Sequence, residues 1–394
     1  MCGDIMVKSV VLPASWHQEQ LKDLCLYPGE YGLNSPAIPL SPDLPLYIRI
    51  TDIDDDGRYL LQHRATVIYS GKQKLLQKND LLFARTGATV GKTYLHQDTS
   101  YPTAFAGYLI RFVPNTAKII PYFLFLYCHT AYYWNWIKIF KARSGQPGIS
   151  ADEYGKMLVP CPPIAEQHRI VEVLETWDKA IQLTRELIEQ KELQKKYLMQ
   201  QLLSGRIRLK GFTEKWKTIK LGDICRIYQP KTLSTSQLAP TGFPVFGANG
   251  PIGFYKEYNH QTWQILITCR GATCGTVNRT FGPAWITGNA MVINADGSSE
   301  IEKLFLFYLL MNKNFAPLIS GSGQPQIVRG PLENLAIIIP VQKAEQIMIS
   351  SILQKADKEI DLLRQKLAKL EEQKKGLMQV LLTGKVRLAV KETK

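Results

Sequence analysis

The sequence lacks the features that mark secreted, membrane-spanning and metal-binding proteins. Its 394 residues contain no run of about 18 apolar residues, the length that a membrane-spanning helix requires. Residues 1–8 contain no basic stretch followed by an apolar run, which a secretion signal would show. The seven cysteines are scattered, and neither they nor the six histidines show metal-site spacing. We therefore expect a soluble, cytoplasmic protein with reduced cysteines and without a metal or cofactor of its own.

Acidic residues are scarce relative to basic ones. The chain contains 34 Asp and Glu against 48 Lys and Arg, so its formal net charge is +14 and its pI is about 9.3. This excess is typical of proteins that bind a polyanion, and nucleic acid is the leading candidate. Because 45% of the residues are hydrophobic and 10% are aromatic, the chain can bury substantial cores, and its length suits two or more domains.

Catalytic signatures are incomplete. Gly87–Lys92 resembles a phosphate-binding loop, but three residues separate its glycines where that loop has four, and the related stretch Gly271–Thr276 has no lysine. We interpret both stretches as turns close to a DNA backbone or a neighbouring strand. The sequence has no Asn-Pro-Pro-aromatic or Asp-Pro-Pro-aromatic tetrapeptide, which would hold an extruded adenine during methyl transfer. The nuclease-like triplets Glu189–Lys191 and Glu372–Lys374 have no partner acidic cluster, so we predict a chain without catalytic residues.

The chain contains an internal repeat, which organises the rest of the interpretation. The paired segments are Trp16–Cys25 with Trp216–Cys225 at an offset of 200, Gly87–Gly91 with Gly271–Gly275 at 184, Ser144–Pro147 with Ser322–Pro325 at 178, and Ala165–Gln167 with Ala344–Gln346 at 179. The offset falls by 200 − 184 = 16 residues in the early part and is nearly constant afterwards. Each copy therefore has a variable front and a fixed back.

Each fixed back is predicted to be one long helix. Apolar residues recur there at alternating spacings of three and four, the pattern of a coiled-coil seam. The seams comprise Ile170, Leu174, Trp177, Ile181, Thr184, Ile188, Leu198 and Leu202, with Lys191 and Lys195 in a gap, and Ile349, Leu353, Ala356, Ile360, Leu363, Leu367, Leu370, Lys374, Leu377 and Leu381. Pro163 and Pro340 suit the two beginnings, and Gly205 and Gly384 suit the two ends.

The connectivity predicts how the halves are related. The first helix would carry the chain about 60 Å before the second front begins, and the second helix can return only if it runs antiparallel. The fronts contain strand-like segments bounded by turn residues, namely Leu81–Ala84, Tyr108–Val113, Ile265–Thr268 and Ala290–Ile293, and helical segments at 121–140 and 301–311. We predict an α+β fold with a pseudo-two-fold internal repeat: two mixed α/β domains (1–157 and 211–335) joined by two long antiparallel coiled-coil helices (158–210 and 336–394).

Basic and amide side chains of the fronts are the candidate nucleic-acid contacts. Arginine can fork onto guanine, asparagine and glutamine can pair with adenine, and lysine can hold phosphates. The candidates are Tyr47, Arg49, Lys72, Lys74, Arg85, Lys92, Arg143 and Gln146 in the first front, and Asn249, Lys256, Arg270, Arg279, Gln324 and Arg329 in the second.

The chain closely resembles the specificity subunits of type I restriction-modification systems over nearly its whole length. The resemblance rests on Leu158–Ile170, which opens the first helix, on Leu202–Leu209, which closes it, and on the two glycine stretches. The second helix opening, Ile338–Gln346, lacks the double proline, but Glu345, Gln346 and the closing segment Leu381–Leu388 are kept.

The resemblance implies a division of labour. The two variable fronts would be target-recognition domains, each reading one half of a split, asymmetric target in double-stranded DNA. Two modification subunits would supply S-adenosylmethionine and adenine-N6 methyl transfer, and restriction subunits would supply ATP-driven translocation and cleavage. The helices would set the spacing and dock the modification subunits, and we expect the contact residues to be Glu166, Gln167, Arg169, Glu345 and Gln346.

Two other classes of function are compatible with parts of the sequence. A fused methyltransferase or nuclease would require the cofactor loop or acidic cluster that we do not find, and binding of S-adenosylmethionine by the isolated chain would support it. A stand-alone bipartite DNA-binding protein or scaffold agrees with the charge and the repeat. Co-purification with a methyltransferase-like partner distinguishes it from a specificity subunit.

Overall fold

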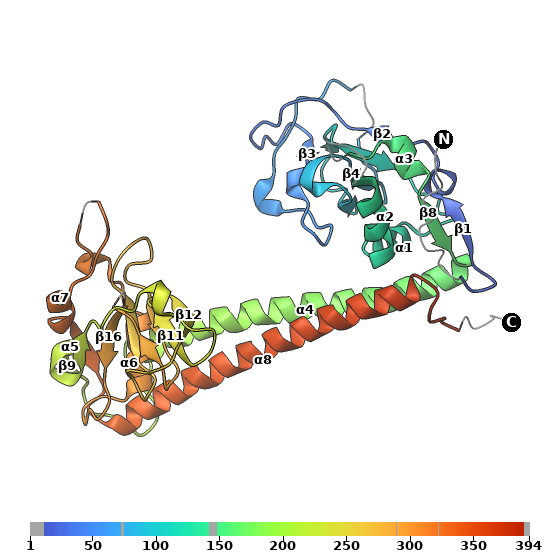
Figure 1. Cartoon of the computed structure of the whole chain (residues 1–394). Coiled ribbons are helices and arrows are strands. Elements are labelled where there is room, and N and C mark those ends of the chain that lie inside the picture. Colours follow the sequence, from blue (N-terminus) through green and yellow to red (C-terminus); the bar gives the residue numbers. More distant parts are fainter. Residues whose placement is uncertain (1–11, 72–74, 142–147, 289, 322, 390–394) are drawn as a thin grey trace. The chain divides into compact units, whose positions relative to one another are not determined.

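The computed structural model describes residues 12–71, 75–141, 148–288, 290–321 and 323–389 (Figure 1). The chain divides into two compact units. Unit 1 comprises residues 1–183 and 367–394, and unit 2 comprises residues 184–366. Each unit thus contains one variable front, the beginning of the long helix that follows this front, and the end of the other long helix.

Unit 1 is built around a four-stranded sheet with the order β2-β7-β4-β5. Its strands are β1 (His17–Gln20), β2 (Glu30–Tyr31), β3 (Leu46–Ile48), β4 (Leu81–Ala84), β5 (Thr93–Leu95), β6 (Thr103–Phe105), β7 (Leu109–Phe112) and β8 (Leu158–Cys161), and its short helices are α1 (Pro121–Tyr127), α2 (Ala131–Lys141) and α3 (Ala151–Gly155). Strands β1 and β8 pair antiparallel, so the start of the front is tied to the segment that leads into the long helix.

Unit 2 is built around a four-stranded sheet with the order β10-β16-β13-β14 and a three-stranded sheet with the order β12-β11-β15. Its strands are β9 (Lys217–Lys220), β10 (Arg226–Tyr228), β11 (Phe243–Gly247), β12 (Gly250–Tyr255), β13 (Ile265–Thr268), β14 (Val277–Arg279), β15 (Trp285–Ile286), β16 (Ala290–Asn294) and β17 (Ala336–Ile339), and its short helices are α5 (Leu221–Ile224), α6 (Lys303–Met311) and α7 (Arg329–Glu333). Strands β9 and β17 pair antiparallel, as β1 and β8 do in unit 1.

The two four-stranded sheets repeat one another in strand order and register. In unit 1, Leu81 of β4 pairs with Phe112 of β7. In unit 2, Ile265 of β13 pairs with Ile293 of β16, and 265 − 81 = 184 is the offset of the glycine stretches. The strands predicted at these places are confirmed. They form because short runs of apolar residues, buried on both sides, are bounded by turn residues.

The long helices α4 (Ile164–Leu202) and α8 (Lys343–Leu381) have 39 residues each and confirm the two helices predicted from the seams. Gly205 and Gly384 follow them with φ of +70° and +72°, the left-handed conformation in which glycine commonly terminates a helix. In unit 1 the end of α8 joins the core around the beginning of α4, and in unit 2 the end of α4 joins the core around the beginning of α8. The two helical segments therefore run antiparallel within each unit.

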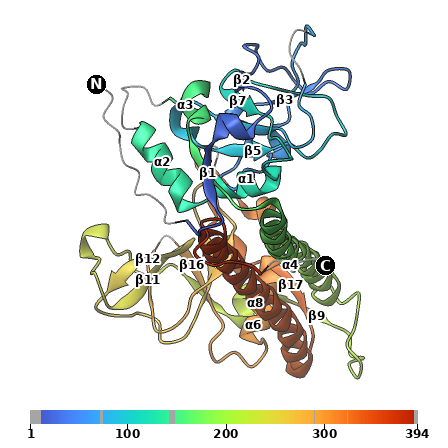
Figure 2. The same ribbon diagram turned by 90° about the vertical axis from the view of Figure 1, so that its right-hand side faces the viewer.

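One predicted element differs from the structure. The helix predicted over residues 121–140 is two helices, α1 and α2, because the Thr130 hydroxyl donates to the Tyr127 carbonyl and accepts from the Tyr133 amide, which begins a new helix. Figure 2 shows α1 beside the beginning of α4. No helix in the described ranges is long and apolar enough to span a membrane.

Candidate nucleic-acid interface

The two motifs that the sequence repeats separately lie together in unit 2. The Gly271–Gly275 turn leaves the end of β13, and Arg270 pairs with Gln326, the residue that follows the Ser322–Pro325 motif. The Gly271 amide donates to the Pro325 carbonyl at 3.0 Å. In unit 1 the corresponding bridge joins Thr86 to Gly148, and the first copy of the motif, residues 144–147, lies wholly outside the described residues. The backbone bridge beside the glycine turn is thus present in both units, and we call this backbone arrangement the frame.

The two glycines of each turn have different roles. Gly87 and Gly271 have φ of +68° and +84°, and a Cβ atom there would meet nothing within 4 Å, so the first glycine lies on an open surface. Gly91 and Gly275 have φ of +95° and +89°. A Cβ atom would lie 2.9 Å from Ile137 in unit 1 and 3.1 Å from Phe315 in unit 2, so the second glycine lets the turn pack closely.

The Lys92 side chain does not serve the glycine turn. Its ammonium donates to the Ile53 carbonyl at 3.3 Å and forms an ion pair with Asp55 at 2.8 Å. This ion pair holds the pKa of the Asp55 carboxyl below its ordinary value. The resemblance to a phosphate-binding loop is therefore superficial in the structure as well as in the spacing.

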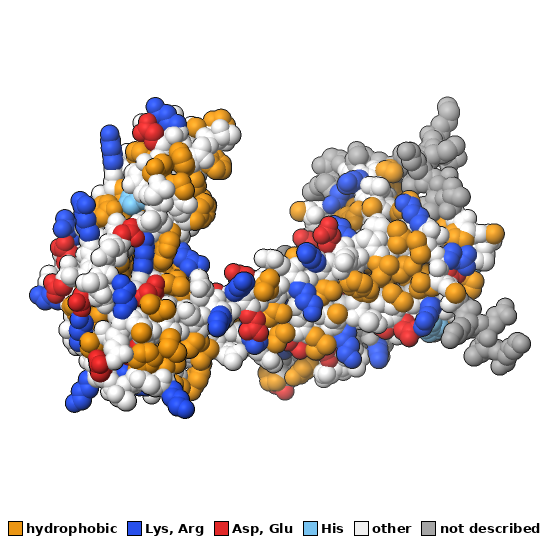
Figure 3. Space-filling view, turned by 90° about the horizontal axis from the view of Figure 1, so that it is seen from below, with side chains coloured by type: hydrophobic (Ala, Val, Ile, Leu, Met, Phe, Trp, Pro, Cys, Tyr) orange, Lys and Arg blue, Asp and Glu red, His pale blue; other side chains and the backbone are white. Residues whose placement is uncertain are grey.

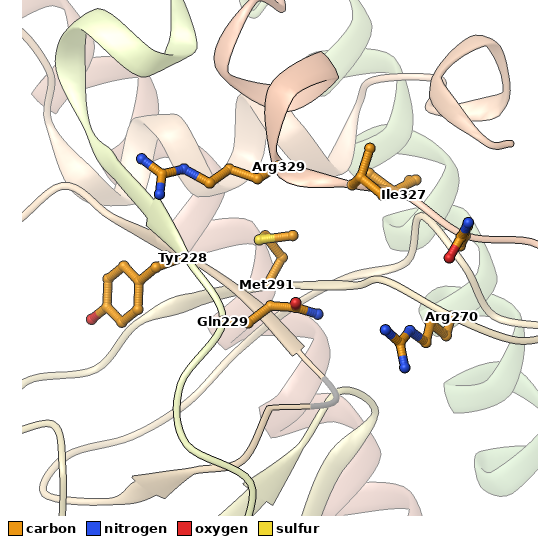
Figure 4. Close-up of a pocket in the computed structure, with 8 residues that line it drawn as sticks. Tyr228, Gln229, Arg270, Met291, Ile327 and Arg329 are labelled. Carbon is orange, nitrogen blue, oxygen red and sulfur yellow. The ribbon is translucent and has the colours of Figure 1, made fainter.

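An open cavity of about 250 Å³ lies beside the turn in unit 2 (Figure 4). Its rim carries Arg270, which follows β13, and Arg329, the first residue of α7. The side chains of Met291 and Ile327 are buried and form its apolar floor. Gln229, which follows β10, donates from its side-chain amide to Cys269 Sγ at 3.1 Å and to the Gly288 carbonyl at 3.4 Å. Cationic and amide groups thus line one opening.

Tyr228 lines this cavity, and its ring contacts the neighbouring side chains of His260 and Arg226. Its hydroxyl is 2.7 Å from Nε2 of His260, and the two rings stack with centroids 6.0 Å apart. The Arg226 guanidinium lies 4.9 Å from the centroid of the Tyr228 ring. Burial lowers the pKa of His260, so the imidazole is neutral near pH 7.

Unit 1 carries different side chains at the corresponding place. Arg111 of β7 pairs with Glu30, and Val292 of β16 pairs with Tyr228, so the next residues, Tyr31 and Gln229, correspond. The Arg85 guanidinium lies 4.7 Å from the centroid of the Tyr31 ring. The Tyr31 hydroxyl accepts a hydrogen bond from the amide of Ala151 at 3.0 Å. One backbone frame therefore presents two unlike sets of side chains.

The backs of the two units, by contrast, use the same kinds of side chain, although the two tyrosines lie about one turn apart in their respective helices. Asp178 of α4 accepts from the Tyr122 hydroxyl at 2.7 Å and from the Lys374 ammonium at 2.5 Å. Asp357 of α8 accepts from the Tyr308 hydroxyl at 2.6 Å and forms an ion pair with Lys195. Burial raises the pKa of both tyrosines well above the ordinary value, and the neighbouring carboxylate raises it further. We call these two sets the Tyr–Asp–Lys clamps.

Comparison with known proteins identifies the family of this two-unit architecture. The sequence profile of the type I restriction modification DNA specificity domain matches residues 16–193 and 213–372. The chain belongs to the specificity-subunit family of type I restriction-modification systems. It is 30% identical over 338 residues to the EcoprrI specificity subunit of Escherichia coli, with 80% of each chain covered, and 23% identical over 415 residues to the MjaVIII specificity subunit of Methanocaldococcus jannaschii, with 96% and 94% covered.

Solved structures show the same fold. The type I system S subunit from M. genitalium matches with a TM-score of 0.60 and 16% identity, and the alignment covers 95% of this chain and 98% of that one. A chain from a structure of a type I restriction-modification system, described for its complex assembly and conformational transition, matches with a TM-score of 0.61 and 20% identity over 95% and 99% of the two chains.

Four of the residues that we expected to contact partner subunits are instead bonded inside their own units. Two of the four are glutamates. Glu166 and Glu345 are buried. Glu166 accepts from the Trp16 indole at 3.1 Å and from Arg387 at 2.5 and 2.6 Å. Glu345 accepts from the Trp216 indole at 3.4 Å and from Arg208 at 2.8 and 3.0 Å. We call these sets the Trp–Glu–Arg nodes.

The neighbouring glutamines are also satisfied within their own units. Gln167 accepts from the Ile120 amide at 2.8 Å and donates to the carbonyls of Pro162 and Lys118. Gln346 accepts from the Glu302 amide at 2.7 Å and donates to the carbonyls of Pro340 and Glu300. The prediction of a partner surface is corrected for Glu166, Gln167, Glu345 and Gln346, because a buried, fully paired side chain is not offered to a partner. Arg169 is exposed and pairs with Glu172 at 2.6 Å.

Three residues of unit 1 that we predicted to contact DNA bond instead to other groups within the unit. Tyr47 is a core residue whose hydroxyl donates to the Leu33 carbonyl at 2.7 Å, so its assignment to a DNA surface is corrected. Arg49 forks onto the buried Asp52 with two bonds of 2.8 Å. Lys92 serves Asp55, as described above. Arg85 lies against Tyr31 beside the glycine turn, so its prediction as a DNA contact stands. The other four predicted contacts of unit 1 lie outside the described residues, namely Lys72, Lys74, Arg143 and Gln146.

Some of the predicted DNA contacts in unit 2 lie at the glycine turn, and others lie away from it. Asn249 donates to the Thr273 hydroxyl at 2.9 Å and so ties the β11–β12 turn to the glycine turn. Lys256 and Gln324 are exposed. The Arg279 guanidinium lies 5.2 Å from the centroid of the Phe307 ring. The structure adds Gln229 and Gln326 to the cavity, and no local sequence signal marked either residue.

Proposed function

We propose that the chain is the sequence-reading, non-catalytic subunit of a type I restriction-modification complex, in which each unit reads one half of a bipartite, asymmetric DNA site. The observation that carries this proposal is the shared frame around the glycine turn, which presents Arg85 and Tyr31 in unit 1 and Arg270, Gln229 and Gln326 in unit 2. Identical frames position two surfaces equivalently, and unlike side chains give them different base preferences. The net charge of +14 supplies attraction to phosphates.

The long helices are proposed to form an antiparallel coiled coil that relates the two units by a pseudo-two-fold axis and sets the spacing of the half-sites. The Tyr–Asp–Lys clamps support this role because each one ties a front to both helices within its unit. The Trp–Glu–Arg nodes support it because each one ties a front to the beginning of one helix and to the segment that follows the other. Such repeated fastening is expected where two readers must hold equivalent orientations.

The helices are also proposed to dock two modification subunits, which would supply S-adenosylmethionine and methyl transfer, and restriction subunits would join that complex. In place of the buried glutamates and glutamines, exposed apolar side chains on the helices offer the contact surface. These are Leu183, Leu187, Leu193, Tyr197, Ile347, Met348 and Leu362. Figure 3 shows apolar side chains interspersed with charged ones along the exposed helix surface. Burial of these side chains against a partner would remove their apolar surface from water.

The test is a map of methylated adenines made with the chain and its modification subunits present. The proposal expects a split motif with two unlike halves. Replacing residues 211–335 with the matching region of a related specificity subunit should change one half only. A change in both halves would contradict the proposal. Failure of the chain to co-purify with a methyltransferase and to direct methylation would also contradict it and would favour a stand-alone DNA-binding protein.

A further inference from the structure

The cavity beside the glycine turn of unit 2 has the chemistry of a site for one base pair. We infer that it reads the major-groove edge of a G·C pair, with Arg270 as the residue that recognises guanine. This inference rests on the proposed function, since it concerns how the second unit reads its half-site. It adds a single subsite, a base identity and the residues responsible.

Arg270 has the properties that a base reader requires. Its side chain is exposed, and among the described residues its guanidinium has no ion pair or hydrogen bond. Its backbone is held on both sides, by the bridge to Gln326 and by the bond from the Gly271 amide to the Pro325 carbonyl. A guanidinium on a fixed backbone can donate two parallel hydrogen bonds to O6 and N7 of guanine, which is the commonest base-specific contact to DNA.

Gln229 supplies an acceptor for the other base of the pair. Its amide nitrogen is committed to Cys269 Sγ and the Gly288 carbonyl, which orients the side chain and leaves the carbonyl oxygen without a partner among the described residues. The N4 amino group of cytosine is a hydrogen-bond donor in the major groove. A donor fork on Arg270 beside a free acceptor on Gln229 therefore matches G·C better than A·T.

Arg329 is assigned to a phosphate and not to a base. Its Nε donates to Glu333 at 2.7 Å, which occupies part of the fork, and 62% of its side chain is exposed. The remaining guanidinium donors can hold a backbone oxygen, a contact that positions the protein without reading sequence. Arg270 and Arg329 thus divide specificity and affinity between them.

The cavity suits the edge of a stacked pair and not an extruded base. An extruded base is held between aromatic or apolar faces in a deep pocket. Among the described residues that line the cavity, Tyr228 alone is aromatic, and its ring already lies against the His260 imidazole and the Arg226 guanidinium. The volume of about 250 Å³ is also below the range of about 300–1,000 Å³ that is usual for enclosed ligand sites.

The experiment compares Arg270→Ala, Arg270→Lys and Arg329→Ala in the complex with the modification subunits. DNA libraries randomised in both half-sites are selected for binding, and the bound sequences are read. Arg270→Ala should reduce discrimination at one G·C position of one half-site by about 10-fold to 100-fold, the effect of losing one bidentate pair. Arg270→Lys should lose the same discrimination while keeping most of the affinity, since lysine retains the charge but not the fork.

Arg329→Ala and the exposed Lys313→Ala serve as matched controls. Arg329→Ala should weaken binding to all sequences alike and reduce the slope of log affinity against log salt by about one. Lys313→Ala, at a residue that does not line the cavity, should leave the selected motif unchanged. If both Arg270 variants select the wild-type motif, the inference is overturned although the proposed function stands. If the wild-type complex selects no motif at all, the proposed function itself fails.

Discussion

The two units differ where they would meet DNA and agree where they are fastened. At the open end of the central sheet, unit 1 has Arg85 stacked on Tyr31, and unit 2 has Arg270 and Gln229 around a cavity. At the helices, both units have the same nodes and clamps with bond lengths that agree to a few tenths of an ångström. Side-chain identity is therefore kept where geometry must be equal, and it is free to vary where the targets differ.

The largest effect should come from lengthening both helices. A seven-residue insertion after Ile188 and a second one after Leu367 keep the seam in phase and extend each helix by about 10 Å. If the helices set the spacing, the preferred half-site separation should increase by up to about three base pairs, at about 3.4 Å each, and the half-site sequences should not change. Methylation across a library of spacer lengths measures this. Full activity at the original spacing would show that the helices do not set the distance, and an insertion in one helix only should abolish activity.

Removing a buried glutamate from either node should destabilise its unit strongly. Glu166→Ala and Glu345→Ala each leave an indole N–H and a guanidinium without their acceptor, and we expect a loss of about 3 kcal/mol in the free energy of unfolding. The expected losses are similar because the nodes are equivalent. Denaturant unfolding of each variant measures them, with the exposed Glu172→Ala as the control. A loss in only one unit would break the equivalence of the nodes.

The second glycine of each turn should tolerate substitution less well than the first. Gly275→Ala strains a backbone with φ of +89° and brings a Cβ atom to 3.1 Å from Phe315, so we expect a cost of about 2 kcal/mol. Gly271→Ala has only the backbone strain, about 1 kcal/mol, because the space there is open. Thermal unfolding compares the two variants. Equal costs would show that close packing of the second glycine is unimportant.

Removing a clamp hydroxyl should have a modest and symmetric effect. Tyr122→Phe and Tyr308→Phe each delete one hydrogen bond to a carboxylate that keeps its lysine, so we expect a loss of about 1 kcal/mol from each. The double variant should lose the sum, since the clamps lie in separate units. Chemical unfolding of the single and double variants checks additivity. A loss from the double variant well above the sum would show coupling between the units.

The smallest effect should be an acid-side loss confined to unit 2. Burial lowers the pKa of His260 below its ordinary value of 6.5, while Asp296 raises it and Lys303 lowers it. A depressed folded-state pKa gives a contribution that is present above the unfolded pKa and is lost as the pH falls below about 6.5. His260→Gln should therefore flatten the fall in unfolding free energy between pH 6.5 and pH 5 by less than about 1 kcal/mol. An unchanged slope would show that folding does not shift the pKa of this imidazole.

The fold was predictable where its signals are local or periodic. The seams marked α4 and α8, and Gly205 and Gly384 marked their ends, because helix periodicity and left-handed glycine are properties of a few consecutive residues. The break at Thr130 was missed because residues 121–140 are apolar on both sides of it.

The site was less predictable because its partners are remote in sequence. Glu166 stands in the first turn of a helix, a place that suggests a surface residue, and its burial is decided by Trp16 and Arg387, which lie 150 and 221 residues away. Tyr47 was assigned to DNA although its hydroxyl is used inside the core. One signal was available for the clamps: Lys195 and Lys374 interrupt the seams at equivalent positions, and Asp178 and Asp357 lie at equivalent positions beside the seams, since 374 − 195 and 357 − 178 are both 179.

The two nodes also differ in how their chain segments are tethered. In unit 2, Arg208 and Trp216 are joined by a link of 216 − 208 = 8 residues, so each is held at high effective concentration near the other. In unit 1, Arg387 and Trp16 are separated by 387 − 16 = 371 residues, and bringing them together from a disordered chain costs about 3 kcal/mol more in loop-closure entropy. The Arg208–Trp216 contact of unit 2 can therefore form locally, whereas the Arg387–Trp16 contact of unit 1 joins two distant segments of the chain. Both nodes are complete only when their glutamate joins them, since Glu345 lies 129 residues from Trp216 and Glu166 lies 150 residues from Trp16.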